Sequence, residues 1–217
     1  MDYRELRELM VRTQLIPRGI SDKRVLAAME RVPRHLFVDA STMTNAYSDM
    51  ALPIGEGQTI SQPYMVAVMT ELLELNGTER VLEVGTGSGY QAAVLAELSK
   101  DVFTIERIAA LAERAKKKFQ DLSYSNIHCR VGDGSLGWPE EAPFDRIIIT
   151  AGAPEIPKPL TEQLAEGGIL VIPVGDLYSQ MLLKSRKTGD NLSREYHTPC
   201  VFVPLIGQHA WNKDLST

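Results

Sequence analysis

The first sixty residues show helical periodicity and then lose it. Apolar residues recur at helical spacing among alternating charges over residues 3–15, which predicts an amphipathic helix. A second helix is expected to begin at Ser21, a residue type that suits the N-cap, and to end at Pro33. Residues 39–60 have no sustained period and contain proline and glycine, so we expect a long ordered loop. The pattern therefore predicts an N-terminal helical cap followed by a loop.

Beyond this loop, segments with a helical period alternate with short apolar segments rich in β-branched residues. A helix is expected from Gln62, and another over residues 108–122. The expected strands cover residues 80–85, 102–106, 127–131, 144–150 and 169–174. Nearly continuous apolar strands that alternate with helices are typical of a mostly parallel sheet with helices on both faces.

The pattern changes again near the C-terminus. Residues 180–187 and 193–205 are two strand-like runs separated by a turn sequence, Thr-Gly-Asp-Asn, which predicts a hairpin. We therefore expect a single α/β domain with a Rossmann-like, doubly wound, mostly parallel sheet, an antiparallel C-terminal edge and the N-terminal helical cap. Its expected parts are the cap and loop (1–60), a nucleoside-binding α/β core (61–175) and a C-terminal hairpin and tail (176–217).

Composition and charge narrow the possible functions. The 217 residues are 44% hydrophobic and 24% charged, as in ordinary globular proteins. No apolar run approaches the roughly 20 residues of a membrane-spanning helix, and the N-terminus lacks the centre of a signal peptide, so we expect a cytoplasmic protein without a membrane partner. The net charge of −5 argues against a nucleic-acid partner. Two cysteines, Cys129 and Cys200, provide no disulfide framework and no zinc quartet, and we expect both reduced.

Three glycines alternate just after the first core strand, in Gly85-Thr-Gly87-Ser-Gly89-Tyr90. Such residues let the backbone turn sharply and approach a ligand closely, and ligands of open α/β sheets bind outside the carboxyl ends of the strands. A phosphate-binding loop would end in Gly-Lys-Ser or Gly-Lys-Thr, and a dinucleotide fingerprint has glycine where this chain has Tyr90. The turn therefore suits an uncharged nucleoside better than a nucleotide phosphate.

Acidic residues mark the ends of three successive core strands. Glu83 lies just before the turn, where a carboxylate repels a pyrophosphate but suits a ligand with a cationic amine or sulfonium. Glu106 ends the second strand, the position of an acid that binds ribose hydroxyls. Asp133 follows the third strand, where its carboxylate is placed to accept a hydrogen bond from an adenine amino group. We expect these strand ends to form a nucleoside site.

At these residues the sequence resembles the class I S-adenosylmethionine-dependent methyltransferases, whose first motif is similar to Val-Leu-Glu-Val-Gly-Thr-Gly-Ser-Gly at residues 81–89. Three further segments resemble the protein-L-isoaspartate O-methyltransferase family: residues 32–38 (VPRHLFV), 57–65 (GQTISQPYM) and 202–207 (FVPLIG). The resemblance covers nearly the whole chain. It implies methyl transfer from S-adenosylmethionine to the α-carboxylate of L-isoaspartyl residues, which begins the repair of damaged proteins and peptides.

Carried over by position, the resemblance implies a set of site residues. Ser61 is the catalytic residue that it implies, with Thr59, Ser61, Val203 and Leu205 at the substrate. The implied contacts of S-adenosylmethionine are Thr59, Ile60, Ser61, Glu83, Gly85, Thr86, Gly87, Ser88, Gly89, Glu106, Arg107, Asp133 and Gly134. Ala210 before Trp211 departs from the glycine that relatives often have, which leaves the conformation of the C-terminal tail open.

The chemistry of this reaction explains which motifs are missing. A carboxylate that attacks a sulfonium loses its charge as the neutral ester forms, so positioning and exclusion of water help more than a strong base. The sequence contains no metal-binding pattern and no nucleophile elbow, and we expect no metal.

Two interpretations of Ser61 stay open. It is either an ordinary N-cap serine, or its hydroxyl and the helix-start amides around Thr59–Ser61 hold the acceptor carboxylate. An extended peptide is expected to lie along the chain near Val203–Ile206. We expect a monomer that acts on isoaspartyl proteins. The alternatives are another S-adenosylmethionine-dependent methyltransferase with a small-molecule acceptor, and a nucleoside-binding module without chemistry.

Overall fold

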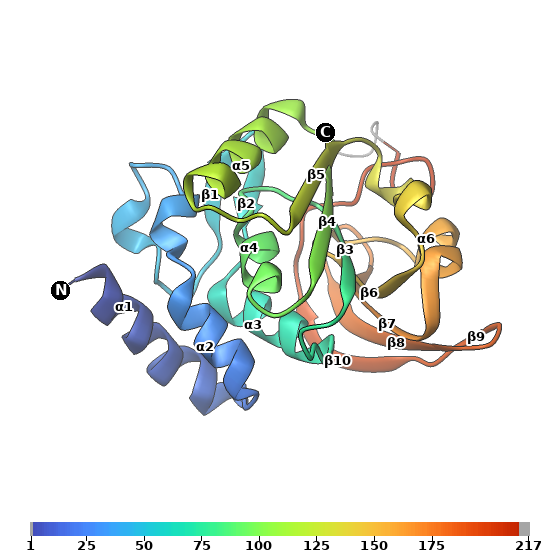
Figure 1. Cartoon of the computed structure of the whole chain (residues 1–217), viewed down its shortest axis with the longest axis horizontal. Helices are drawn as coiled ribbons and strands as arrows, with labels where there is room; N and C mark the ends of the chain where they lie inside the picture. The colour runs from blue at the N-terminus through green and yellow to red at the C-terminus, as the bar shows by residue number, and fades with distance from the viewer. Residues whose placement is uncertain (1, 213–217) are drawn as a thin grey trace.

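The structure, a computed structural model, describes residues 2–212 and consists of one large twisted sheet flanked by helices (Figure 1). The strands of this sheet are β3 (Arg80–Val84), β4 (Asp101–Glu106), β5 (Ile127–Val131), β6 (Phe144–Ile149), β7 (Leu164–Gly175), β8 (Gln180–Thr188), β9 (Asn191–Leu192) and β10 (Glu195–Cys200). The α-helices are α1 (Tyr3–Met10), α2 (Lys23–Arg31), α3 (Pro63–Leu72), α4 (Tyr90–Ala96), α5 (Ala109–Asp121) and α6 (Lys158–Gln163).

The strand order confirms the predicted doubly wound topology. Along the sheet it reads β10-β8-β7-β6-β3-β4-β5, with β9 paired to β8. The pairs from β5 to β7 are parallel, whereas β8 is antiparallel to β7 and β10 is antiparallel to β8. The chain winds outward from β3 through β4 to β5 and then returns to β6 on the other side of β3. This reversal creates a crevice at the carboxyl ends of β3 and β6, the place where such sheets bind ligands.

Two strand boundaries differ from the expectation by five residues, and the other differences are of one or two residues. β7 begins at Leu164, five residues early, because Leu164 pairs with Phe144 before a register shift lets the strand continue through Gly167 and Gly168. The last strand ends at Cys200 rather than at residue 205. Residues 201–206 leave the sheet and bond to the loop after β6 instead, where Gly152 donates to the Val203 carbonyl and accepts from the Leu205 amide. The C-terminal segment is thereby carried across the mouth of the crevice.

The helical cap forms as predicted, with different helix boundaries. Asp2 begins α1 with a capping box, and the helix continues beyond Met10 as a π-helical turn, Val11–Leu15, and a 3₁₀ turn, Ile16–Arg18. The N-cap of α2 is Asp22, whose carboxylate accepts from the Arg24 amide, so the assignment of Ser21 was wrong. The Ser21 amide instead donates to the Glu71 carboxylate at 2.7 Å, which attaches the cap to α3.

The segment expected to be a long loop contains a β-hairpin. Its strands, β1 (Leu52–Gly55) and β2 (Gln58–Ile60), pair in an antiparallel manner around a tight turn. Two short 3₁₀ turns, Arg34–Phe37 and Met43–Asn45, precede it. Leu52, Ile54 and Ile60 are buried. These three apolar side chains pack in the same apolar cluster as α3, α4 and α5 and so fix the hairpin in place. The two strands are too short to show a period in the sequence.

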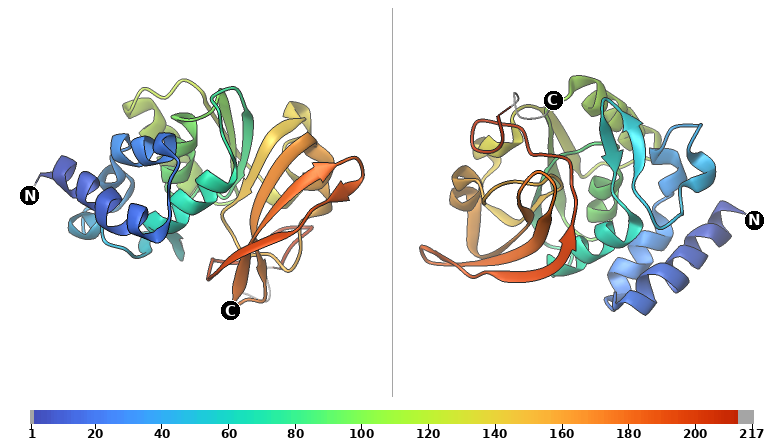
Figure 2. Two further views of the ribbon diagram at one scale, coloured as in Figure 1. Left: turned by 90° about the horizontal axis from the view of Figure 1, so that it is seen from below. Right: turned by 180° about the vertical axis from the view of Figure 1, so that it is seen from behind.

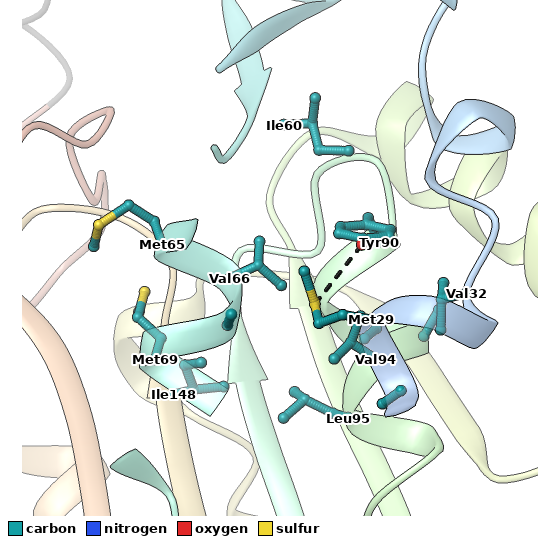
Figure 3. Close-up of a cluster of buried hydrophobic side chains, with 14 of the residues drawn as sticks. Met29, Val32, Ile60, Met65, Val66, Met69, Tyr90, Val94, Leu95 and Ile148 are labelled. Carbon is teal, nitrogen blue, oxygen red and sulfur yellow. Dashed lines mark hydrogen bonds between the residues drawn. The ribbon is translucent and has the colours of Figure 1, made fainter. Parts of the chain in front are cut away.

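Two apolar clusters cover the two faces of the sheet. The larger joins the cap, α3, α4 and α5 to one face, and the smaller joins α6 and the C-terminal segment to the other. Figure 3 shows the centre of the larger cluster, where Met29 of α2 contacts the Tyr90 hydroxyl at the start of α4. Figure 2 shows α1 and α2 at one end of the molecule and β8 and β10 at the other. The crevice lies between these ends.

Short 3₁₀ turns complete the connections beside the smaller cluster. They are Gly134–Leu136, directly after β5, and Pro139–Glu141 before β6. Within residues 2–212, no helix combines the length and the apolar character needed to cross a membrane.

Candidate active site

The glycine turn follows β3 and needs glycine for steric reasons. Gly85 has φ +99°, and a Cβ there would lie 2.5 Å from the Thr150 hydroxyl oxygen. Gly89 has φ +88°, and its Cβ would lie 2.7 Å from the Phe119 ring of α5. Both conformations are rare for residues with side chains. The turn is therefore held between the end of β6 on one side and α5 on the other.

The amides of this turn are mostly used inside the protein. The Gly85 and Thr86 amides both donate to the Ile105 carbonyl, and the Gly87 amide donates to a Glu106 carboxylate oxygen at 2.9 Å. A turn that binds phosphate points its amides at the ligand instead. This geometry agrees with the expectation that the site is not built for a pyrophosphate.

Glu106 shapes the turn and also faces the cavity. Its second carboxylate oxygen accepts from the Ile108 amide at 2.9 Å, and the side chain is buried. A carboxylate offers about four acceptor positions, so further hydrogen bonds remain open to a ligand. Two backbone bonds fix the orientation of this acid before any ligand arrives.

Glu83 lies beneath the turn instead of on the cavity wall. Its side chain is fully buried, one oxygen accepts from the Thr104 hydroxyl, and the other has no partner within residues 2–212. Burial is the main cause that raises the pKa of this carboxyl to about 8, and the nearby charge of Glu106 adds to it. Glu83 does not line the cavity, so the expected contact with a cationic ligand is not formed. Side chains alternate along β3, and this one shares its face with Val81, on the side that α3, α4 and α5 cover.

Asp133 holds the C-terminal segment in place. One carboxylate oxygen accepts from the amide and hydroxyl of Ser135, and the other accepts from the Gln208 amide at 2.7 Å. Gly207 passes so close that a Cβ there would lie 2.1 Å from Asp133 Oδ1. This carboxylate therefore fixes the segment whose neighbouring residue, Ile206, reaches the cavity.

A cavity of about 760 Å³, measured out to its open mouth, occupies the crevice. Its wall combines the glycine turn, the ends of β3, β4 and β6, the β2–α3 junction and the C-terminal segment. The lining residues are Gln58, Thr59, Ile60, Ser61, Val66, Val84, Gly85, Thr86, Gly87, Ser88, Tyr90, Gln91, Ile105, Glu106, Arg107, Gly134, Thr150, Ala151, Val203, Pro204, Leu205 and Ile206.

Ser61 lies between this cavity and a second one. The N-cap of α3 is Gln62, and within residues 2–212 the Ser61 hydroxyl has no hydrogen-bond partner, so the N-cap interpretation was wrong. The amides of Thr59–Ser61 are not at the start of a helix, contrary to the expectation. Thr59 belongs to β2, and the helix begins at Pro63, which has no N–H. The serine hydroxyl is left available to a ligand.

The second cavity is a groove of about 710 Å³, also measured out to its mouth, between α3 and the end of β10. It shares Thr59, Ser61, Thr150 and Val203 with the first cavity. The remaining lining residues are Arg18, Ala51, Gln62, Tyr64, Met65, Thr198, Pro199, Cys200, Val201 and Phe202. The two cavities therefore meet at four residues, one of which is Ser61.

Most of the expected site residues are brought together here. Glu83, Gly89 and Asp133 do not line the cavity and act behind or beside it. Thr150, which the sequence reasoning missed, lies at the meeting point and donates to the Gly85 carbonyl at 2.7 Å. Its position at the carboxyl end of the strand beside β3 was the available signal. No group of three or more potential metal ligands gathers anywhere in residues 2–212.

A family model described as protein-L-isoaspartate(D-aspartate) O-methyltransferase matches residues 6–210. A protein-L-isoaspartate O-methyltransferase of Geobacter metallireducens is 54% identical over 215 residues, which cover 99% of this chain and 100% of that protein. The corresponding protein of Trichlorobacter lovleyi is 57% identical over 206 residues, covering 94% of this chain and 95% of that one.

Solved structures agree with these sequence relationships. A protein-L-isoaspartate O-methyltransferase with 28% sequence identity superposes with a TM-score of 0.85, covering 96% of this chain and 67% of that chain. A Plasmodium falciparum protein described as a protein-L-isoaspartate O-methyltransferase, in complex with S-adenosyl-L-homocysteine, gives a TM-score of 0.78 at 26% identity. That match covers 95% of this chain and 99% of the other.

Proposed function

The chain belongs to the protein-L-isoaspartate(D-aspartate) O-methyltransferase family, and on this premise we propose that its two cavities hold the two substrates of that reaction. S-adenosylmethionine occupies the cavity in the crevice, which we call the inner cavity, and an isoaspartyl-containing peptide segment lies in the groove. The methyl group is transferred to the α-carboxylate of the isoaspartyl residue. The observation that supports this arrangement is the meeting of the two cavities at Thr59, Ser61, Thr150 and Val203.

The residues of the inner cavity fit a sulfonium nucleoside. Glu106 presents a fixed carboxylate, which suits the paired hydroxyls of a ribose. Val84, Ile105 and Leu205 provide apolar wall, which suits the flat adenine ring. Gly85, Thr86, Gly87 and Ser88 form the wall on the side of the turn, where we place the amino-acid part of the nucleoside.

Glu83, Gly89 and Asp133 keep a role in this proposal through the residues that they support. Gly89 lets the turn pack on α5, Glu83 bonds to Thr104 beneath the turn, and Asp133 fixes the C-terminal segment. We therefore place them behind the residues that contact the nucleoside. A direct contact between Asp133 and adenine would require the carboxylate to reach the cavity, whose wall it does not form in this structure.

The chain contributes positioning to the chemical step. An oxygen of the acceptor carboxylate forms a bond to the methyl carbon while the carbon–sulfur bond breaks, and the electron pair goes to sulfur. An anion and a cation become a neutral ester and a neutral thioether, so no proton has to be removed. The Ser61 hydroxyl, which has no partner within residues 2–212, is placed to donate to the acceptor carboxylate and hold it in line.

A comparison of two peptides tests the reaction. The purified protein is incubated with methyl-labelled S-adenosylmethionine and either an isoaspartyl peptide or the same peptide with normal aspartate. We expect base-labile label on the isoaspartyl peptide alone. Equal labelling of both peptides, or of neither, would reject the proposed acceptor and leave the alternative of a small-molecule acceptor.

A serine variant tests the proposed role of Ser61. Loss of a hydrogen bond to a charged group costs about 1.5–3 kcal/mol, so Ser61→Ala should lower kcat/KM by roughly tenfold to a hundredfold. Ser41→Ala, an exposed serine of the cap, is the matched control and should keep wild-type turnover. Full activity of Ser61→Ala would remove this serine from the mechanism without affecting the peptide comparison.

Three finer features belong to the same proposal. We propose that residues 1–217 act as one domain, with the cap and loop (1–60), the nucleoside-binding core (61–175) and the C-terminal part (176–217) as its regions. We also propose a monomer that works in the cytoplasm without a nucleic-acid or membrane partner, and the net charge of −5 supports the absence of nucleic acid. Light scattering on the purified protein tests the monomer.

A further inference from the structure

Arg18 is the charged residue among those that line the groove. It ends the 3₁₀ turn that follows α1, and its side chain is 41% exposed. The guanidinium lies over the Tyr64 ring, with Cζ 3.5 Å from the ring centroid. Stacking on an aromatic face fixes the plane of a guanidinium and leaves its edges free for hydrogen bonds.

One edge of this guanidinium is used and another is not. Nη1 donates to both carboxylate oxygens of Asp49, at 3.0 and 3.3 Å. Within residues 2–212, Nε and Nη2 have no hydrogen-bond partner. Nε and Nη2 lie on the same side of the group and form a fork that matches the two oxygens of a carboxylate. Arg18 therefore offers a bidentate carboxylate site in the wall of the groove.

The position of Arg18 relative to Ser61 limits which carboxylate reaches it. Tyr64 is three residues after Ser61, so their Cα atoms are at most about 11 Å apart. Arg18 stacks on Tyr64 and lines the same groove as Ser61, and an extended peptide advances about 3.3 Å per residue, so a peptide anchored at Ser61 reaches Arg18 within a few residues of the isoaspartate. The reacting α-carboxylate stays at Ser61, and Arg18 meets a different group of the same chain.

We propose that Arg18 is a specificity-determining residue that binds a second carboxylate of the substrate chain, close to the isoaspartyl residue. This inference rests on the proposed function, because it assumes that the groove holds the peptide. The second carboxylate is an acidic side chain, or the C-terminal carboxylate of a peptide that ends at that point. Asp49 partly neutralises the guanidinium from its other edge, so the preference is modest.

Matched peptides measure this preference. Each contains one isoaspartate and is amidated at its C-terminus, and glutamate or glutamine is placed at each position from one to six residues away on either side. We expect kcat/KM for the glutamate peptide to exceed that for its glutamine partner by about two- to fivefold at one or two positions, since exposed ion pairs are weak. The difference should lie in KM and should be absent at the remaining positions. A glutamine peptide with a free C-terminus at the preferred position separates the two sources of carboxylate.

Variants assign the preference to Arg18. In Arg18→Ala, the ratio of kcat/KM for the glutamate peptide to kcat/KM for the glutamine peptide should fall to about one. In Arg18→Lys this ratio should be intermediate, because lysine keeps the charge and loses the fork. Asp49→Asn should raise the ratio, because it removes the negative charge that partly neutralises the guanidinium. Arg31→Ala is the matched control: Arg31 is also exposed and paired to an acid, Glu97, but does not line the groove, so the wild-type ratio should persist.

Several results would overturn the inference. A wild-type ratio near one at all positions would do so, as would an unchanged ratio in Arg18→Ala. An equal loss for all peptides would show that Arg18 binds the reacting carboxylate instead. If Arg18→Ala fails to fold, the ratio of the wild type at low and high salt decides, because an ion pair predicts a fall toward one as salt screens it. Absence of methylation of every isoaspartyl peptide would reject the proposed function itself.

Discussion

Replacement of Glu83 by glutamine isolates the cost of burying an acid beneath the glycine turn. Glu83 is fully buried, and only one of its carboxylate oxygens has a partner within residues 2–212. Glutamine has nearly the same shape and can bond to Thr104, but it does not titrate. The difference in the free energy of unfolding between wild type and Glu83→Gln, followed as a function of pH, therefore reports the ionisation of this one group.

The sign follows from the raised pKa. In the folded protein the pKa of Glu83 is about 8, and its ordinary value is 4.5. Between these values the folded state holds a proton that the unfolded state has lost, so the free energy of unfolding falls as pH rises. Each pH unit is worth about 1.4 kcal/mol, which gives a loss of about 2–3 kcal/mol for the wild type between pH 5 and pH 7. Below pH 4.5 this penalty disappears.

Urea denaturation from pH 5 to pH 8 measures the effect. We expect the stability of Glu83→Gln relative to wild type to rise by about 2–3 kcal/mol between pH 5 and pH 7 and then to level off near pH 8. Glu113→Gln, which removes an exposed acid of α5, should follow the wild-type curve. Parallel curves for wild type and Glu83→Gln would show that Glu83 is ionised in the folded protein, and the reasoning from burial would be refuted.

Four other substitutions test the turn, the C-terminal segment and the cap. Gly85→Ala should destabilise the protein by about 2–4 kcal/mol in urea denaturation and weaken nucleoside binding, because its Cβ meets Thr150 at a positive φ; wild-type stability would contradict the geometry of the turn. Gly207→Ala should displace the segment held by Asp133 and raise the Kd for S-adenosylhomocysteine in calorimetry by roughly tenfold, about 1.4 kcal/mol; an unchanged Kd would show that the segment does not help to bind the nucleoside. Asp22→Ala should lower the stability by about 1 kcal/mol and Ser21→Ala by much less, as thermal unfolding can show; equal losses would contradict the N-cap assignment.

The order of the elements in the core could be predicted because the helices have a helical period and the strands are short apolar segments. Residues 169–174, for example, are continuously apolar, as is typical of a strand that is buried on both faces of a sheet. The boundaries of the helices in the cap were harder to predict from the sequence. Ser21 and Asp22 are both good N-cap residues, and the choice between them depends on Glu71, fifty residues away in sequence, which binds the Ser21 amide.

The candidate site was predictable where it depends on backbone geometry. The alternating glycines and Glu106 indicated the turn and its acid, because strand ends of a parallel sheet meet at one edge. The hairpin at residues 52–60 and the path of residues 201–206 were not predictable. Both depend on contacts with distant segments, as the bonds between Gly152 and residues 203 and 205 illustrate. For the same reason, the partnership of Asp133 with Gln208 left no signal in the sequence.

The central claim is that methyl transfer takes place where the two cavities meet. A crystal structure with S-adenosylhomocysteine and an isoaspartyl peptide tests it most directly. We predict the ribose hydroxyls on Glu106, the sulfur in the inner cavity, and the free α-carboxylate of the isoaspartyl residue beside Ser61. A nucleoside bound outside this cavity, or a peptide whose carboxylate lies away from Ser61, would contradict the claim.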